Sequence, residues 1–237
     1  MNREEITQLF EQQAPHYDTQ WEKMAPINDG MYFLIETLVS DLPSNARILC
    51  VGAGTGREVI FLARRFKGWD FTVVEPSGAM LNLCRELLEK EGIASRCHFH
   101  EGYLDTLSMT DKHDAATCFN VSHFILDREQ RTTFFAEIAH RLKPNGLLIS
   151  SDLSFDTRAE NYQSILTLWF RVMSDADISA ENIERMKNTY KNDVAILPLQ
   201  DIISIFNKAG FKDSTPFYQA GLIQAYFSRR NAYSAPS

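Results

Sequence analysis

The stretch CVGAGTGREV, Cys50 to Val59, places three glycines within five positions. The run before it, RILCV (47–51), is apolar enough to predict a buried strand. After it, apolar residues recur at the spacing of one helix face: Val59, Ile60, Ala63 and Phe66. A glycine-rich turn between a parallel strand and a helix lets a ligand touch backbone N–H groups without meeting Cβ atoms. The stretch therefore predicts a ligand-binding strand–turn–helix unit.

The composition is typical of one large α/β domain. With 237 residues the chain can bury a substantial core. No run approaches the roughly 18 apolar residues of a membrane span, and MNREEITQLF at the start lacks the apolar segment of a signal peptide. The net charge of −7 argues against a protein that binds nucleic acid regardless of sequence. The four cysteines form no CxxC or Cys/His cluster, which argues against a zinc site. We expect a cytoplasmic protein with reduced thiols, no metal site, no membrane partner and no sequence-specific nucleic acid.

From residue 46 the chain alternates short β-rich runs with helical patterns, which predicts a parallel sheet with crossover helices. The predicted strands of this alternation are 47–51, 71–75, 97–102, 114–120 and 147–154. Helix N-caps are predicted at Ser77, Asp127 and Ser179. Near the end, FKDSTPFY (211–218) and LIQAYFS (222–228) are close enough to pair as a hairpin. The expected fold is α/β, a doubly wound, mostly parallel seven-stranded Rossmann-like sheet with a C-terminal antiparallel hairpin.

Two helical patterns follow the strand at 147–154, where a plain alternation has one. We expect them to form a helical cap over the carboxyl edge of the sheet. The chain is accordingly divided into an N-terminal helical lid (1–30), an α/β core (31–154), the cap (155–196), and a last crossover helix with the hairpin (197–237).

The glycine turn departs from a dinucleotide-binding fingerprint. That fingerprint, GxGxxG, requires a third glycine where this chain has Arg57. Glu75 ends the second predicted strand, and a carboxylate there accepts both hydroxyls of an unphosphorylated ribose. GxGxG with this acid therefore indicates a nucleoside ligand without a pyrophosphate.

Five motifs together resemble the class I S-adenosylmethionine-dependent methyltransferases, in that family's order and spacing. They are ILCVGAGTGRE, VVEPSGAML, HEGYLDTL, HDAATCFNVSHFI and RLKPNGLLISSD. The resemblance covers about residues 10 to 229 and implies S-adenosylmethionine as cofactor and S-adenosylhomocysteine as product. It also implies a set of cofactor-contacting residues: Tyr17, Gly52, Ala53, Gly54, Thr55, Gly56, Glu75, Pro76, Met80, Tyr103, Leu104, Asn120 and Val121.

The resemblance assigns parts of the cofactor to these residues. Gly52, Ala53 and Gly54 line the methionine part, and Asn120 meets its amino-acid end. By the same likeness Glu75 binds the ribose, Pro76 and Met80 lie near the adenine, and the Leu104 N–H meets the ring.

The third-strand motif and the N-terminal segment add two features. The family often has an Asp directly after the glycine of the third-strand motif, where this chain has Tyr103, with Asp105 two places on. Either Asp105 substitutes, or stacking and backbone contacts alone hold the adenine. The segment FEQQAPHYD (10–18) resembles one that many relatives fold over the cofactor, which nominates Tyr17.

The predicted function is methyl transfer to a small-molecule acceptor. A homodimer is one of the assemblies compatible with the sequence. Displacement at a sulfonium-bound carbon depends mainly on positioning and desolvation. An oxygen or unactivated nitrogen acceptor also needs a base, for which His123, Asp152 and Tyr17 are the candidates. The cap is expected to choose the acceptor, through Trp169, Arg185, Lys187 and Tyr190, although an aromatic stripe such as Tyr162, Trp169 and Met173 is also typical of a core.

Other functions stay open at this point. The stretch from NVSHF through LISSDLSF to NKAGF also resembles carboxy-S-adenosylmethionine synthases, which modify the cofactor for a tRNA pathway. An arginine in their cap holds the added carboxylate, and the matching positions here are Lys187 and Arg185; a lysine cannot bind it in bidentate fashion. An NAD-dependent oxidoreductase is disfavoured by Arg57 and the antiparallel hairpin. A non-catalytic cofactor-binding protein is the remaining alternative.

Overall fold

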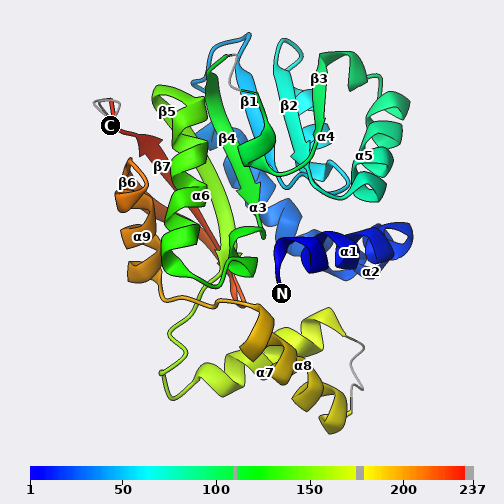
Figure 1. Cartoon of the computed structure of the whole chain (residues 1–237), viewed down its shortest axis with the longest axis vertical. Helices are drawn as coiled ribbons and strands as arrows, with labels where there is room; N and C mark the ends of the chain where they lie inside the picture. Colours follow the sequence, from blue (N-terminus) through cyan, green and yellow to red (C-terminus); the bar gives the residue numbers. More distant parts are fainter. Residues whose placement is uncertain (109–110, 175–178, 233–237) are drawn as a thin grey trace.

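A seven-stranded sheet runs through the molecule in the order β3-β2-β1-β4-β5-β7-β6. The computed structural model describes residues 1–108, 111–174 and 179–232. The strands are β1 Arg47–Val51, β2 Asp70–Glu75, β3 Cys97–Glu101, β4 His113–Phe119, β5 Leu142–Leu153, β6 Phe211–Ala220 and β7 Ile223–Arg230. The first five pair in parallel, and β7 lies antiparallel between β5 and β6. The predicted fold class is confirmed (Figure 1).

Helices cover both faces of this sheet (Figure 1). Their bounds are α1 Arg3–Gln13, α2 Tyr17–Gln20, α3 Ala25–Leu38, α4 Arg57–Arg65, α5 Gly78–Lys90, α6 Arg128–Arg141, α7 Tyr162–Met173, α8 Ala180–Asp193 and α9 Leu199–Lys208. The apolar sides of α3, α4 and α5 share one core cluster, and those of α6 and α9 share another. The sheet is therefore sandwiched between two helical layers.

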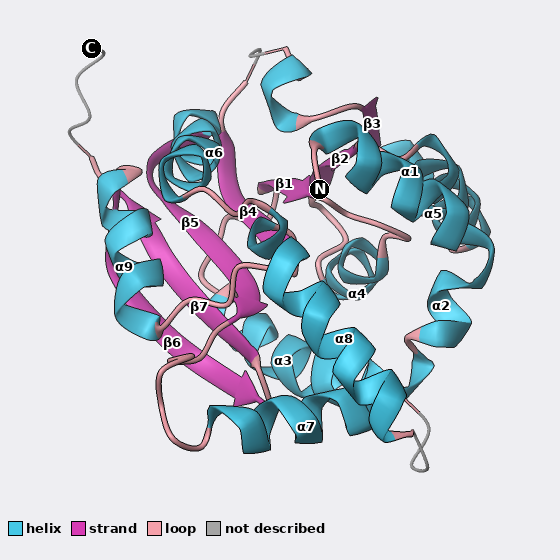
Figure 2. Cartoon of the chain, turned by 60° about the horizontal axis from the view of Figure 1, so that its bottom comes forward, coloured by secondary structure: helices cyan, strands magenta, loops and turns pink. Residues whose placement is uncertain are grey.

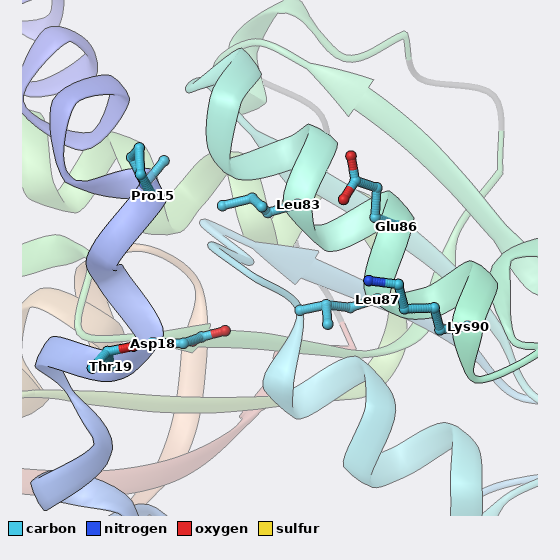
Figure 3. A pocket seen from close by; sticks show the side chains of 8 residues that line it. Pro15, Asp18, Thr19, Leu83, Glu86, Leu87 and Lys90 are labelled. Atoms are coloured by element: carbon cyan, nitrogen blue, oxygen red, sulfur yellow. The ribbon is translucent and has the colours of Figure 1, made fainter.

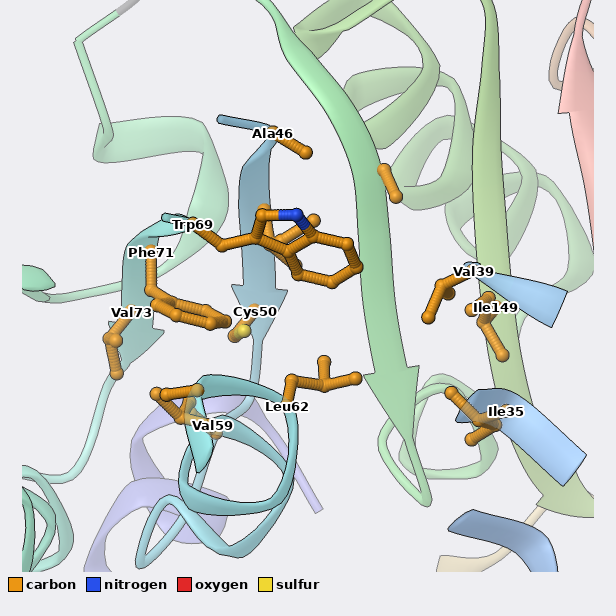
Figure 4. Packing of buried hydrophobic residues seen from close by; sticks show 14 of the residues in the cluster. Ile35, Val39, Ala46, Cys50, Val59, Leu62, Trp69, Phe71, Val73 and Ile149 are labelled. Atoms are coloured by element: carbon orange, nitrogen blue, oxygen red, sulfur yellow. The ribbon is translucent and has the colours of Figure 1, made fainter. Parts of the chain in front are cut away.

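The first core cluster fixes the start of the glycine turn. Trp69 and Phe71 lie beside Cys50 of β1, with Val59 and Leu62 of α4 on the same side (Figure 4). All five residues are at most 2% exposed. Because the strand before the turn and the helix after it are both packed into one core, the turn between them has little freedom to move.

Several local predictions are confirmed, and one helix was missed. Ser77 Oγ accepts a hydrogen bond from the Met80 N–H, and Asp127 and Ser179 cap their helices in the same way. Helix α3 was not predicted, and the proposed boundary after residue 30 lies inside it. β5 begins at Leu142, earlier than predicted, directly after α6.

The carboxyl ends of the parallel strands face the N-terminal helices and the cap. Figure 2 shows α7 and α8 on this side of the sheet, with α1 and α2 beside them. A third core cluster joins Trp169 and Phe170 of α7 to Met24 near α3 and Leu222 beside β7. Residues 175–178 of the predicted cap lie outside the described part. No helix among the described residues is long and apolar enough to cross a membrane.

Candidate active site

The turn between β1 and α4 owes its shape to glycines with positive φ. The φ angles are +67° at Gly52, +54° at Gly54 and +80° at Gly56, a region that side chains rarely adopt. The N–H groups of Gly52 and Ala53 donate to Val74 O at 2.9 and 3.2 Å. These two N–H groups are therefore already bonded to the end of β2, and the prediction that Gly52, Ala53 and Gly54 line the methionine part of the cofactor stays a prediction. The glycines serve the shape of the turn.

The space around each glycine separates packing from ligand approach. A Cβ on Gly52 would lie 2.4 Å from Val121 Cγ2, and one on Gly56 would lie 2.5 Å from Cys84 Sγ. A Cβ on Gly54 would meet nothing within 4 Å. Gly52 and Gly56 are thus required by the core, whereas Gly54 leaves open space that fits a ligand passing close to the backbone.

Glu75 closes the turn from the end of β2. Its Oε2 accepts the Gly54 N–H and its Oε1 accepts the Ser77 N–H, both at 2.9 Å. The residue is 6% exposed, and burial raises its pKa despite these two donors. An ionised carboxylate has about four lone-pair positions. Two acceptor positions therefore remain, which fits the diol of a ribose.

Helix α1 reaches across to α5. Glu11 Oε1 accepts from Ser77 Oγ at 2.9 Å and from the Ala79 N–H at 3.2 Å. A carboxylate at this place complements the positive end of the α5 dipole. The N-terminal segment is thus tied directly beside Glu75, at the edge that the glycine turn faces.

The residues predicted around the adenine also contact α1. The Tyr103 hydroxyl donates to Arg3 O at 2.5 Å, and the Arg3 guanidinium lies 4.6 Å from the Tyr103 ring centroid. The same guanidinium pairs with Asp105 at 2.7 Å. Of the two open alternatives for the adenine, the one that uses the Asp105 carboxylate would have to compete with this ion pair. Leu104 is 4% exposed, and Met80 is 1% exposed.

A second part of the N-terminal segment contacts the turn itself. Asp18 Oδ1 accepts from Thr55 Oγ1 at 2.9 Å and from Arg57 Nε at 3.0 Å. Burial, followed by the negative charges of Glu75 and Asp18, raises the pKa of the neighbouring Tyr17 to about 12. The Tyr17 phenol therefore stays protonated at neutral pH, which disfavours it as the base.

A pocket opens where the N-terminal segment meets α5. It holds about 140 Å³ between Pro15 and Asp18 on one side and Leu83, Leu87 and Lys90 on the other (Figure 3). Asp18, which also contacts the glycine turn, lines this pocket, but none of the predicted catalytic candidates does. The predicted site itself is the edge described above.

Asn120 and Val121 complete this edge at the end of β4. Asn120 has φ +57°, which Asn tolerates better than most residues. Its N–H donates to Ser151 O at 2.8 Å, and Ser151 Oγ donates to its Oδ1 at 3.2 Å. Val121 packs against Gly52. Since β2, β1 and β4 are neighbours, the structure brings Glu75, the glycine turn and Asn120 to one edge.

A buried polar cluster lies at the adjoining end of β5. Asp152 Oδ1 accepts from His123 Nδ1 at 2.7 Å and from the His123 N–H at 2.8 Å. Asp152 Oδ2 accepts from Arg131 Nη2 at 2.7 Å and from Ser122 Oγ. The Arg131 Nε also donates to Ser122 Oγ, at 2.7 Å. His123 and Asp152, which the sequence nominated separately, thus form one pair.

The charge of Asp152 follows from these donors. Burial alone would raise its pKa, but the Arg131 guanidinium and the hydrogen bonds from His123 and Ser122 lower it to about 2. Asp152 therefore stays ionised at neutral pH and cannot accept a proton there. We assign the Nδ1 proton of His123 from this bond, which leaves Nε2 as the acceptor nitrogen of the neutral ring.

The four residues predicted to contact the methyl acceptor lie in different parts of the cap. Trp169 is 2% exposed, and its Nε1–H donates to Tyr190 Oη at 3.0 Å. Arg185 is exposed and donates to Asn182 on the surface of α8. Lys187 and Tyr190 instead line a groove between α7 and α8 of about 380 Å³. The prediction for Trp169 is therefore corrected to a core role, because its side chain is enclosed by the cap.

The groove has a cationic rim. Lys187 pairs with Glu184 at 2.7 Å, and Lys191 lines the same groove one turn further along α8. Leu166, Val194 and Ile196 supply apolar surface. The wall is also close to His123, since the N–H of Ala195, which lines the groove, donates to His123 O at 2.8 Å.

Glu58 and Arg131 are among the buried charged residues that the sequence did not predict. Glu58 is 8% exposed and Arg131 is 0% exposed. Each lies one helical turn before a core residue, Leu62 in α4 and Phe135 in α6. Their register with an apolar helix face is a signal that could have found them.

Comparisons with known proteins agree with this arrangement. Residues 48–146 match the methyltransferase domain family. An uncharacterised protein of Synechococcus sp. is 30% identical over 103 residues, which is 43% of this chain and 24% of that protein. The chain thus spans about a quarter of that relative.

Two solved structures illustrate the shared fold. A candidate O-methyltransferase of Nostoc punctiforme superposes with a TM-score of 0.67 at 18% identity, covering 93% of this chain and 60% of that one. Human N-acetylserotonin methyltransferase in complex with S-adenosylmethionine gives a TM-score of 0.58 at 16% identity, covering 81% of this chain and 49% of that one. The predicted class I methyltransferase fold is confirmed.

Proposed function

We propose that the protein uses S-adenosylmethionine to transfer a methyl group to a small organic acceptor, a proposal supported by the match of residues 48–146 to the methyltransferase domain family. The observation that carries the proposal is the edge formed by Glu75, the open face of Gly54, and Asn120, beside the His123–Asp152 pair. Bound there, S-adenosylmethionine supplies the activated methyl group.

In this proposal the turn and the acid position the methyl donor. Glu75 accepts the two ribose hydroxyls with its remaining lone pairs, and Gly54 lets the ligand approach the backbone. Asn120 meets the amino-acid end of the donor. The N-terminal segment, held by Glu11 and Asp18, excludes water from this edge.

His123 is the proposed base for an oxygen or nitrogen acceptor. Asp152 holds the imidazole by its Nδ1–H and stays ionised, so that Nε2 takes the acceptor proton and the resulting imidazolium is stabilised. Asp152 is therefore a positioning residue. Tyr17, with its raised pKa, is a donor to the bound molecules instead.

The groove between α7 and α8 is the proposed acceptor site. Its apolar surface and the Lys187 and Lys191 ammonium groups fit an amphipathic molecule that carries an anionic group. Tyr190 supports the wall, because its hydroxyl is already held by Trp169.

The cofactor proposal is tested by calorimetry on Glu75. Each charge-assisted hydrogen bond lost in a dry site costs about 1.5–3 kcal/mol, so Glu75→Ala should weaken S-adenosylhomocysteine binding at least tenfold. The affinity of Glu75→Gln should lie between that of the natural protein and that of Glu75→Ala. Glu101→Gln, at the end of the neighbouring β3, is the matched control. NADH binding more tightly than S-adenosylhomocysteine would overturn the proposal.

The same experiment has a coupling arm. A 2′-deoxyribose analogue should bind the natural protein more weakly than the parent ligand, but the Glu75→Ala variant should hardly distinguish the two. If the losses of affinity caused by the analogue and by Glu75→Ala simply add, Glu75 does not contact the ribose. Mass spectrometry of any ligand that co-purifies separates the parent cofactor from its carboxylated form.

The base is tested with His123→Gln. A screen of phenols and aromatic carboxylic acids with methyl-labelled donor supplies an acceptor, and loss of the base should lower kcat about 10²–10⁴-fold. Affinity for S-adenosylhomocysteine should be unchanged, and His98→Gln on β3 is the matched control. An unchanged kcat in His123→Gln would contradict the role.

A further inference from the structure

Four aromatic side chains form a continuous row beside the proposed base. The Phe124 ring centroid lies 4.4 Å from that of His123 and 5.7 Å from that of Phe10 in α1. The Tyr17 ring lies 6.3 Å from that of Phe10, edge to face, and 6.1 Å from that of Trp21. This aromatic row therefore begins next to the His123 imidazole and continues into the N-terminal segment.

Most of the aromatic row lies outside the core of the protein. Phe10, Tyr17 and Phe124 belong to none of the three core clusters of the described residues, and each is only partly buried. Rings within the core, such as Phe135 and Phe206, are at most 1% exposed. Partly exposed rings that gather at one place leave apolar surface in water, which is typical of a ligand-binding site.

Trp21 ends the aromatic row with an unused hydrogen-bond donor. Its ring packs against the third core cluster, which contains Leu166 and Ile196 of the α7–α8 groove. Its Nε1–H is buried and has no hydrogen-bond partner in the described part of the chain. Because a buried donor is normally paired, this N–H suits an oxygen atom of a bound molecule.

His123 also contacts the groove between α7 and α8. The N–H of Ala195, in the groove wall, donates to His123 O at 2.8 Å. His123 therefore contacts two surfaces of different character, the aromatic row and the wall of a groove that carries Lys187 and Lys191. A flat ring with an anionic substituent matches both surfaces.

We propose that Phe10 and Phe124 select a planar aromatic methyl acceptor and hold its ring beside His123, with the anionic group of the acceptor in the α7–α8 groove. The inference rests on the proposed function, because it takes His123 as the base. Contacts between aromatic rings favour an aromatic guest over a saturated ring that carries the same substituents. Phe10 and Phe124 are thus specificity-determining residues for the acceptor, whereas Glu75 serves the donor.

The direct test compares matched probes on the natural protein. Ligand-detected NMR, with saturating S-adenosylhomocysteine, measures the affinity for para-hydroxybenzoate, for a hydroxynaphthoate and for the ring-saturated counterpart of each. Each aromatic probe should bind more tightly than its saturated counterpart, by about fivefold or more. This comparison needs no variant, so it stands even where a variant fails to fold.

Leucine variants then assign this preference to the two rings. Phe10→Leu and Phe124→Leu keep an apolar side chain but remove the ring, so each should lower the affinity for the aromatic probes about threefold or more. The affinities for the saturated counterparts and for S-adenosylhomocysteine should be unchanged. Phe217→Leu is the matched control, because Phe217 of β6 is also partly buried and its ring lies 6.2 Å from that of Phe227.

The outcomes separate the role of the rings from the proposed function. If neither aromatic probe binds more tightly than its saturated counterpart, the role of Phe10 and Phe124 is overturned while the methyl-transfer proposal stands. A preference that survives in a variant overturns the role of the residue replaced. Equal losses of affinity for the probes and for S-adenosylhomocysteine would mean that the rings only hold the N-terminal segment in place. If S-adenosylhomocysteine does not bind the natural protein, the proposed function fails, and the inference with it.

Discussion

Two buried carboxyl groups near the same edge of the sheet have opposite charge states. Asp152, at the end of β5, receives hydrogen bonds from His123, Ser122 and Arg131, and its pKa falls to about 2. Glu58, at the start of α4, receives only its own N–H, and burial raises its pKa to about 8. Both are less than 10% exposed. Burial alone therefore does not decide the charge of a carboxyl. The Arg131 guanidinium, with the hydrogen bonds from His123 and Ser122, keeps Asp152 ionised, whereas Glu75, with two N–H donors and no cation, has a raised pKa.

A carboxylate that holds a histidine in one tautomer has to stay ionised, and the buried Arg131 guanidinium keeps Asp152 in that state.

Removal of the guanidinium should give the largest effect. Arg131→Met leaves the Asp152 carboxylate buried without its cation, and breaking such a pair costs about 3–5 kcal/mol. Chemical denaturation at pH 7 measures the loss. The double variant Arg131→Met with Asp152→Asn should recover part of it, and strictly additive losses would show that the two side chains are not coupled.

Neutralisation of Glu58 should change the pH dependence of stability. The folded pKa of about 8 exceeds the unfolded value of about 4.3, so the folded state holds the extra proton, and stability falls as pH rises toward 8. Between pH 5 and 7.5 the natural protein should lose about 3 kcal/mol relative to Glu58→Gln. Parallel stability profiles of the two proteins would contradict the burial argument.

Asp152 should give the opposite slope at acid pH. Its folded pKa of about 2 lies below the unfolded value of about 3.9, so its contribution is present above pH 4 and is lost as pH falls toward 2. The contribution is about 2.5 kcal/mol. Acid unfolding of the natural protein should therefore be steeper than that of Asp152→Asn, and equal slopes would argue against an ionised Asp152.

Removal of the Ser122 hydroxyl should give the smallest effect. Ser122→Ala removes the hydrogen bond to Asp152 and the acceptor of the Arg131 Nε–H, but leaves the Arg131–Asp152 ion pair and the His123 bonds in place. The loss of these two bonds should cost about 2 kcal/mol. Thermal unfolding at neutral pH is the measurement, and a loss as large as that of Arg131→Met would mean that Ser122 organises the whole cluster.

The central fold was predictable because its signals are local. RILCV predicted β1 with the observed bounds, and Ser77 and Asp127 cap their helices as expected. Helix α3 was missed because Pro26 and Gly30 in its first half are weak signals for a helix. Its apolar residues Met31 and Ile35 stabilise it through the core, which the sequence does not display.

The site was predictable where a residue stands at the end of a strand. Glu75 is the last residue of β2, and Asp152 lies one residue before the end of β5. Because the two strands run in the same direction, both residues lie at the same edge of the sheet. Glu58 and Arg131 were missed because charged residues in helices are usually solvated. Which of two helix faces turns inward is decided by packing against distant residues, and only the structure shows it.

The position of β7 has a consequence for synthesis of the chain. β7 (Ile223–Arg230) inserts beside β5, so residues 147–153 of β5, which pair with it, remain an unpaired edge until β7 leaves the ribosome. At roughly 5–20 residues per second that interval lasts several seconds, during which a bare strand is a template for pairing with another nascent chain. The arrival of Gln224 opposite Asp152 ends this exposure and completes the strand that carries the His123 partner.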